Sequence, residues 1–239
     1  MRLIETPLRQ LGQRDRETWR ALAAPGGVLT SPYLLPEFAE LVDAERGDVR
    51  VVIAEDDGAP AGYFACHAPS AGVVRPVGAP LSDYQGFAAR PGFSIEPDAL
   101  LEPLGASALI YDNWAGPAPG RTRERAGSAV IDLSNGAEAW LENRKGLHRG
   151  HFKKIAQRRR KAEREFGEIR IVFGDPLGER FEALRHWKSA QYRASGLTDL
   201  FAVPWIDGVL ARTAARAFGP FRGLTASLYL GEDLAAVET

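Results

Sequence analysis

The sequence predicts a mixed α/β (α+β) fold in which two similar halves follow each other. In each half, the apolar pattern gives a strand, two helices and then two strands. One motif occurs in both halves (aromatic, apolar, apolar, Pro, any residue, apolar), as YLLPEF (33–38) and FAVPWI (201–206). Residues 1–120 hold nine basic and sixteen acidic residues, whereas residues 121–239 hold twenty-one and fifteen. These observations indicate a duplication with an acidic first half and a basic second half.

The composition excludes several classes of protein. With 239 residues, 45% of them hydrophobic and 26% charged, the chain can bury a core and is neither fibrous nor disordered. A formal net charge of −1 argues against a dedicated polyanion binder. The single cysteine, Cys66, gives no disulfide framework. The first residues, MRLIETPLRQ, lack the apolar run of a signal peptide, and no apolar stretch is long enough to span a bilayer, so we expect a cytoplasmic protein.

Apolar periodicity and turn residues define the elements of the first half. Ser31 is a candidate helix cap, Pro36 suits a first helical turn, and Asp57-Gly58 suits a hairpin turn. A Pro/Gly-rich loop is expected at 115–120. The predicted elements are a strand over 2–8, helices over 13–24 and about 36–45, a hairpin over 49–68, a strand over 72–78, a helix near 96–104, and strands over 108–114 and 128–133.

The second half begins with a basic helix predicted over 137–166. Phe152, Ile155, Ala162 and Phe166 share one face of this helix, and Gly146 and Gly150 are expected to break it in two. The elements that follow are a strand over 168–174, a helix over 178–195 that ends at Gly196, a helix over 203–218, and a hairpin over 224–239. We therefore expect a first domain at 1–133, a linking helix at 134–166 and the opening of a second domain at 167–239.

The basic helix has three interpretations. It holds ten Lys or Arg and one acid, Glu163, between Arg144 and Arg164. It is either a solvated linking helix, a contact to an anionic substrate, cofactor phosphate or acidic first domain, or a nucleic-acid element. The last is disfavoured because Phe152 is the only aromatic interleaved with the cations and no nucleic-acid motif accompanies it. Arg159 lies on the apolar stripe, where it is a candidate partner for a buried carboxylate.

Four blocks of the sequence carry a resemblance to a known family. They are VGAPLSDYQGF (77–87), IYDNWAGPAP (110–119), RRRKAEREFGEIRI (158–171) and WKSAQYRASGLTDLFAVPW (187–205). In these blocks the chain resembles the CelD-like acetyltransferases associated with cellulose biosynthesis, a tandem GNAT fold related to FemABX-type transferases. The resemblance implies transfer of an acyl group from acetyl-CoA, another acyl-CoA or a similar thioester to an amine or hydroxyl of a small-molecule, saccharide or peptide acceptor.

GNAT proteins bind acyl-CoA with an Arg/Gln-x-x-Gly-x-Gly/Ala loop between the fourth strand and the following helix. Backbone N–H groups in such a loop approach the pyrophosphate. In the first half the nearest match is RPVGAP (75–80), where Pro80 removes an amide donor and leaves a damaged cradle. In the second half the chain stops at Thr239, within the third strand, so we expect a fragment of a longer protein with a truncated second GNAT domain. The alternative is a catalytically degenerate GNAT-like binding module.

We expect the acceptor to bind in a cleft between the halves. Lys188, Gln191 and Tyr192 share one helix face, which is either a site or a solvated surface. The candidate catalytic residues are Tyr192, as an acid, and Asp199, which either orients a base or holds the turn before Phe201. The candidate substrate-binding residues are Asp83, Tyr84, Asp112, Trp114, Arg159, Lys188 and Gln191.

The loop residues also have purely structural interpretations. Asp83 can close a turn with Tyr84 packed beside it, and Trp114 can lie at a domain interface. The four histidines predict no metal site, because His148 and His151 lie in cationic surroundings and have no acidic partner nearby in the sequence.

Overall fold

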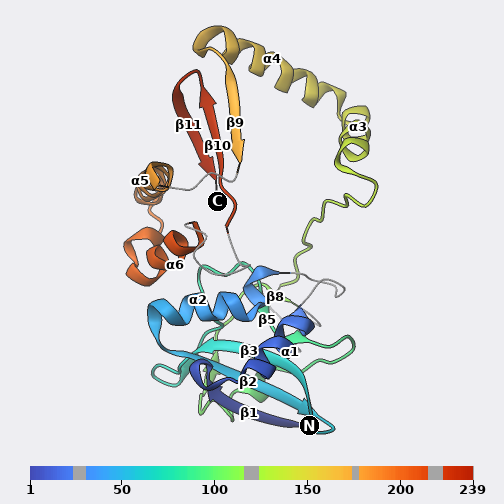
Figure 1. Ribbon diagram of the computed structural model, residues 1–239, viewed down its shortest axis with the longest axis vertical. Helices are drawn as coiled ribbons and strands as arrows, with labels where there is room; N and C mark the ends of the chain where they lie inside the picture. Colours follow the sequence, from blue (N-terminus) through green and yellow to red (C-terminus); the bar gives the residue numbers. More distant parts are fainter. Residues whose placement is uncertain (24–30, 116–123, 174–177, 215–222, 239) are drawn as a thin grey trace. The chain divides into compact units, whose positions relative to one another are not determined.

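The computed structural model describes residues 1–23, 31–115, 124–173, 178–214 and 223–238. It divides into two compact units, each described here by itself. Unit 1 comprises Met1–Arg123 and Lys188–Gly223, and unit 2 comprises Glu124–Trp187 and Leu224–Thr239. The mixed α/β class predicted from the sequence is confirmed (Figure 1).

Unit 1 is built on an antiparallel sheet in the order β1-β2-β3-β6. Two shorter parallel pairs, β4 with β7 and β5 with β8, complete its strands among the described residues. The strands are β1 (Arg2–Pro7), β2 (Val49–Asp56), β3 (Ala59–His67), β4 (Val73–Val74), β5 (Gln85–Gly86), β6 (Ala88–Ala89), β7 (Ala108–Leu109) and β8 (Trp114–Ala115). The helices are η1 (Leu8–Gln10), α1 (Gln13–Ala23), η2 (Pro32–Leu34), α2 (Pro36–Arg46), η3 (Pro97–Leu100), η4 (Leu200–Ala202) and α6 (Pro204–Ala214).

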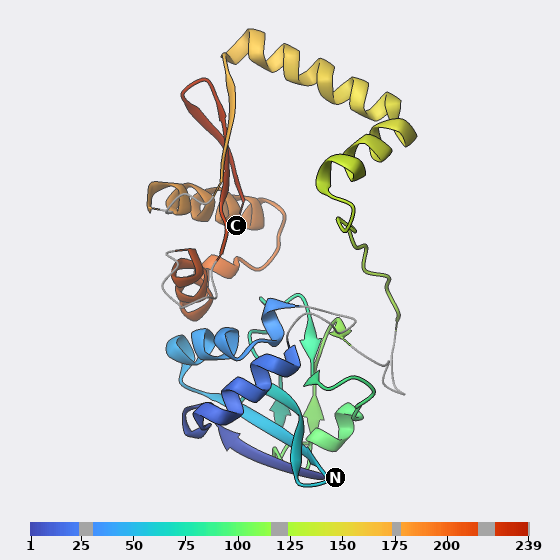
Figure 2. The ribbon, with the colours of Figure 1, turned by 45° about the vertical axis from the view of Figure 1, so that its right-hand side comes forward.

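Side-chain alternation along β2 and β3 gives the sheet two buried faces. Val51 and Tyr63 belong to the cluster that α1 and α2 cover, on the same side of the sheet (Figure 2). Val52 and Phe64 face the opposite way and pack with Leu100 in a second cluster. Because both faces are apolar and covered, a one-residue shift in register would place buried side chains in the wrong cluster.

The two motifs that recur in the sequence have the same local construction. The Ser31 side chain accepts a hydrogen bond from the Tyr33 N–H, which opens η2, and Pro36 then starts α2. The Asp199 side chain accepts one from the Phe201 N–H, which opens η4 ahead of α6. In both places a capped 3-10 turn leads into a helix that begins at proline, five residues after the cap.

Helix α6 packs on α2 within unit 1. The Arg212 guanidinium pairs with the Glu45 carboxylate, and the Arg46 guanidinium lies 5.1 Å from the centre of the Trp205 ring. Gly208 faces α2 so closely that a Cβ there would lie 2.6 Å from Cδ of Glu45. The close approach explains why a glycine is tolerated in the interior of α6.

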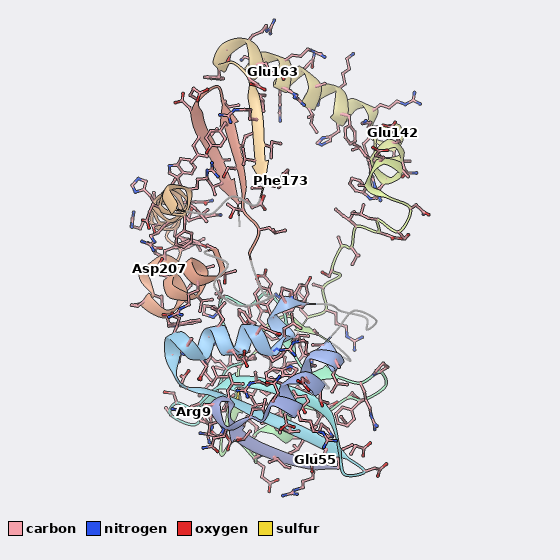
Figure 3. All side chains as sticks on the ribbon, viewed as in Figure 1. Arg9, Glu55, Glu142, Glu163, Phe173 and Asp207 are labelled. Carbon is pink, nitrogen blue, oxygen red and sulfur yellow. The ribbon has the colours of Figure 1, made fainter. Side chains whose placement is uncertain are left out.

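Unit 2 contains a three-stranded antiparallel sheet in the order β11-β10-β9 (Figure 1). Phe181 and Leu184 of α5 are buried, and the Arg180 side chain donates to the Tyr229 hydroxyl at 2.8 Å. Phe173, labelled in Figure 3, is 75% exposed on β9. The elements are α3 (Ala137–Leu147), α4 (Arg149–Phe166), β9 (Ile169–Phe173), α5 (Gly178–Ala194, whose last residues belong to unit 1), β10 (Ala226–Leu230) and β11 (Asp233–Glu238).

Most predicted elements are confirmed within one or two residues, and the basic helix breaks at His148, between the two glycines. Four predictions were wrong in extent or type. The strand expected at 72–78 is only β4, the helix near 96–104 is the 3-10 helix η3, the strand at 108–114 is broken into β7 and β8, and residues 128–133 form no strand. The loop expected at 115–120, apart from Ala115, and the end of the helix at 215–218 lie outside the described residues.

Candidate functional site

The β5–β8 pairing brings four of the predicted site residues together. Gln85 pairs with Trp114, so the chain at 83–85 runs alongside the chain at 112–114. The Gln85 side chain strengthens this arrangement, since its Oε1 accepts a hydrogen bond from the Asp112 N–H at 2.9 Å. Two segments that are far apart in the sequence therefore run side by side, one with Asp83 and Tyr84 and the other with Asp112 and Trp114.

The side chains of this group differ in exposure. Trp114 packs 5.8 Å from the Phe64 ring and 4.9 Å from the Tyr111 ring, as part of the second core cluster. Asp83 and Asp112 are exposed, and the Asp83 carboxylate accepts a hydrogen bond from the Tyr33 hydroxyl at 3.4 Å. Burial and then the Asp83 charge raise the pKa of Tyr33. The carboxylates can contact a ligand, whereas Trp114 has a packing role.

An aromatic cavity lies beside this group. Trp19, Tyr33, Tyr63 and Tyr84 contribute to its wall, and its volume is about 10 Å³. That space holds roughly one water molecule, which is too little for an acceptor. The Trp19 and Tyr63 rings stack at 5.5 Å, and the Tyr63 hydroxyl donates to Asp15 at 3.2 Å. The cavity is thus a small gap between packed rings, and any acceptor must bind outside it.

The predicted residues on α5 form a separate group near the end of that helix. Lys188 and Gln191 are exposed and Tyr192 is half-buried. The helix stops there because Gly196 takes a φ of 66° and the Leu197 N–H bonds back to the Tyr192 carbonyl at 3.0 Å. The common face expected for these side chains is compatible with this geometry, since four residues separate Lys188 from Tyr192 in a regular helix.

Asp199 holds the turn between α5 and η4. One carboxylate oxygen accepts from the Ser189 hydroxyl at 3.0 Å and from the Phe201 N–H at 3.1 Å, and the other accepts from Arg193 at 3.3 Å. Its side chain is only 13% exposed. Of the two roles that the sequence left open, the structure displays the turn-holding one.

Arg159 belongs to the other unit. It is exposed on α4, where its Nε donates to Oε1 of Glu163 at 2.9 Å. A pair of this kind, with both side chains reached by water and four residues apart, contributes about 0.3–0.5 kcal/mol at most. Among the described residues Arg159 pairs with its own helix and not with a buried carboxylate.

The RPVGAP segment does not fit a pyrophosphate. Every backbone N–H from Val77 to Ser82 is already used within the protein. The hydrogen bonds are Val77 N to Ala65 O at 3.0 Å, Gly78 N to His67 Nε2 at 3.1 Å, Ala79 N to Pro76 O at 3.1 Å, Leu81 N to Gly78 O at 2.6 Å and Ser82 N to Gly78 O at 3.0 Å. An anion that approaches residues 77–82 would meet no available amide, so the damaged binding loop expected from Pro80 is closed at these residues.

His67 is the residue that sequence reasoning undervalued. It is 6% exposed, and its Nδ1 lies 3.3 Å from the Asp48 carboxylate. Because Nε2 accepts from Gly78, the neutral ring carries its proton on Nδ1 and donates it to Asp48. Burial and then Arg46 lower the pKa of His67, and Asp48 opposes them. No local signal links a strand histidine to a glycine eleven residues later, so only the structure could find this contact.

Two kinds of feature, a metal-binding cluster and a membrane-spanning helix, are absent from the described residues. No group of three or more His, Cys, Asp or Glu side chains there is arranged to hold a metal ion. In the same part of the chain, no helix is long and apolar enough to cross a bilayer.

The comparison with protein families matches the later part of the chain. Residues 149–239 match the family model of an acetyltransferase (GNAT) domain. The matched region holds α4, β9, α5, α6, β10 and β11, and the mixed α/β structure is consistent with a GNAT-like fold. No curated protein and no solved structure is significantly similar to the chain. The similarity thus supports the acetyltransferase family generally and leaves the choice of substrate to other arguments.

Proposed function

We propose that this chain takes part in GNAT-type acyl transfer, with residues 149–239 as the acetyltransferase part. The observation that carries the proposal is the family match to those residues, which contain a strand, two helices and a hairpin in sequence. In reactions of this class an acceptor amine or hydroxyl replaces the thiol of a thioester, and GNAT domains generally use acyl-CoA as that thioester. The acceptor is a small molecule, a saccharide or a peptide.

The finer identification is part of the same proposal. We assign the chain to the CelD-like branch, related to FemABX-type transferases, with a tandem arrangement, a cytoplasmic location and a role in polysaccharide or cell-envelope synthesis. The tandem arrangement is supported by the equal construction of the two capped turns, at Ser31 and at Asp199. The domains we propose run over 1–133, 134–166 and 167–239, with 134–166 as the link.

The proposed acceptor residues fall into two groups. Asp83 and Asp112 supply exposed carboxylates beside β5 and β8, which would attract a polar or cationic acceptor group. On α5, Lys188 would contact an anionic group, and Tyr192 would donate a proton. Arg159, exposed on α4, stays a candidate for an anion contact.

Thiol release tests this proposal. The full chain is incubated with acetyl-CoA and separate amine, saccharide and peptide acceptors, and free thiol is followed over time. We expect acceptor-dependent release that Tyr192→Phe lowers by roughly a hundredfold, the usual contribution of a general acid. Arg14→Gln, at an exposed residue of α1, is the control and should leave the rate unchanged. Absence of release with every acceptor, at millimolar donor, would count against acyl transfer by this chain.

A second candidate function has a specific observation in its favour. The closed amides at 77–82 are what a catalytically degenerate GNAT-like binding module would display. Such a module would dock a partner protein without turning over a thioester. The two functions separate by calorimetry, since the module predicts no heat with acetyl-CoA, whereas the enzyme predicts a saturable one.

A further inference from the structure

The strand pairing of unit 1 shows where a donor loop would lie in its fold. β6 occupies the fourth position in the sheet, after β1, β2 and β3. The connection at 90–96 follows it and leads into η3. The segment 75–77 also runs along β3, through the bridge between Cys66 and Pro76 and the bond from Val77 N to Ala65 O. Residues 78–87 therefore form an insertion that interrupts the fourth strand, between 75–77 and β6. Residues 90–96 form the loop between that strand and the next helix.

The 90–96 loop has room for a ligand but the wrong chemistry for an anion. Gly92 takes a φ of +78°, and nothing lies within 4 Å of a Cβ built there. However, η3 is a 3-10 helix of four residues, with Glu96 as its N-cap residue and Asp98 in its first turn. A helix this short concentrates little positive potential at its start, and the residues at that start are acidic instead of basic.

The cation of this loop is already engaged. Arg90 pairs with the Asp56 carboxylate, and its guanidinium lies 5.8 Å from the centre of the Phe93 ring. To meet a pyrophosphate it would have to leave both partners. Glu96 and Asp98 add no second cation to this segment.

The insertion at 78–87 has a structural role in unit 1. His67 holds its first amide, at Gly78, and the His67 ring also meets the Trp205 ring edge-on at 5.7 Å. Trp205 comes from α6, which lies in the family-matched region, and Arg46 covers the same ring. The imidazole therefore joins the closed loop to a helix from the other half of the sequence.

We infer that the first half of the chain takes no acyl-CoA and serves instead as the platform that holds α6 of the family-matched half, with His67 as the connecting side chain. This inference rests on the proposed acyl transfer, because it says which half can hold the donor. It explains why both loops of unit 1 that could approach a pyrophosphate are unsuited to it, one closed and one acidic.

Amide hydrogen exchange of the full chain, with and without millimolar acetyl-CoA, tests the first part. Peptides covering 76–84 and 89–97 should exchange at the same rate in both samples. Protection confined to 149–239 supports both the inference and the proposed function. No change in any peptide supports the inference and counts against acyl-CoA as the donor of this chain. Protection of about tenfold in either loop of unit 1 overturns the inference and leaves acyl transfer standing.

Variants of His67 test the platform. In His67→Leu the loop at 76–84 and helix α6 (204–214) should both exchange roughly fivefold to tenfold faster, the effect of losing about one hydrogen bond and its packing. His186→Leu, at an exposed histidine, is the control and should change neither. If only 76–84 speeds up while α6 is unaffected, His67 does not connect them and the platform is refuted. Should His67→Leu fail to fold, Trp205→Leu gives the reciprocal readout, faster exchange at 76–84.

Discussion

Gly208 offers a quantitative test of the packing of α6 on α2. In an exposed helix, replacing an interior glycine by alanine stabilises by about 0.8–1 kcal/mol. Here the added Cβ would overlap the Glu45 carboxylate and lie 2.6 Å from its Cδ, so that side chain must move and leave Arg212. The Arg212 side chain is 47% exposed and that of Glu45 20%, so the lost pair is worth about 0.5–1 kcal/mol. The two effects nearly cancel, and Gly208→Ala alone should change the free energy of unfolding by less than about 0.5 kcal/mol.

A double-mutant cycle separates the two effects. In a Glu45→Ala background the carboxylate is gone, and Gly208→Ala should then stabilise by the full amount of about 1 kcal/mol. The coupling energy expected between the two positions is therefore about 0.5–1 kcal/mol. Urea unfolding of the four proteins, fitted with a common slope, measures it. The matched control is Gly146→Ala in α3, where nothing lies within 4 Å of the added Cβ and Glu45 should have no influence.

One result would refute the reasoning. If Gly208→Ala stabilises by about 1 kcal/mol in both backgrounds, the coupling is zero and residue 208 does not meet Glu45. Helix α6 would then not lie on α2 as the structure has it. A loss larger than about 2 kcal/mol in the wild-type background would be equally informative, because it would mean that Glu45 cannot move aside.

Three further predictions concern single residues of unit 1. Asp199→Ala should lower the free energy of unfolding by about 1–2 kcal/mol in urea, because it removes the cap of η4 and two further hydrogen bonds. Gly78→Ala should cost about 2–4 kcal/mol in the same assay, since φ is +76° and the new Cβ would lie 2.6 Å from Cε1 of Phe38. The third concerns pH. Burial and then Arg46 lower the pKa of His67 from 6.5, so the unfolded chain binds this proton more tightly. The contribution of His67 to the free energy of unfolding is therefore fully present above pH 6.5 and decreases as the pH falls below that value. Urea unfolding measured between pH 5 and 8 should show this decrease in the wild-type protein and lack it in His67→Leu.

Local signals in the sequence predicted the parts of the fold that are built locally. The turn at Asp57-Gly58 was found because both residues tolerate positive φ, and they take 50° and 76°. The start of α2 was found because Ser31 and Pro36 mark it independently of the rest of the protein. Such features depend on a few consecutive residues, so one sequence suffices to predict them.

The features that were missed depend on pairing between distant segments. The strand expected at 72–78 is interrupted because the chain leaves β3 after Val77 and returns at Ala88, where β6 pairs with it. The insertion at 78–87 is stabilised by pairing with β8, more than twenty residues further along the chain, and by the hydrogen bond to His67. For the same reason the sequence predicts the candidate donor loop at 75–80, whereas the segment that follows the fourth strand of the sheet is 90–96. The grouping of Asp83 with Asp112 likewise follows from β5–β8 pairing, which no local pattern specifies.

The two capped turns show how far a repeated motif can be used to argue function. Ser31 and Asp199 build the same backbone turn, but a hydroxyl and a carboxylate have different capacities for further contacts. Asp199 also binds Ser189 and Arg193, and so ties α5 to the start of α6. In the first half that tie is made instead by ion pairs between α1 and α2, such as the one from Arg20 to Glu37. The motif therefore predicts the helix start in both halves, while the contacts that decide a ligand differ between them. A function inferred for one half cannot be transferred to the other on the strength of the repeat.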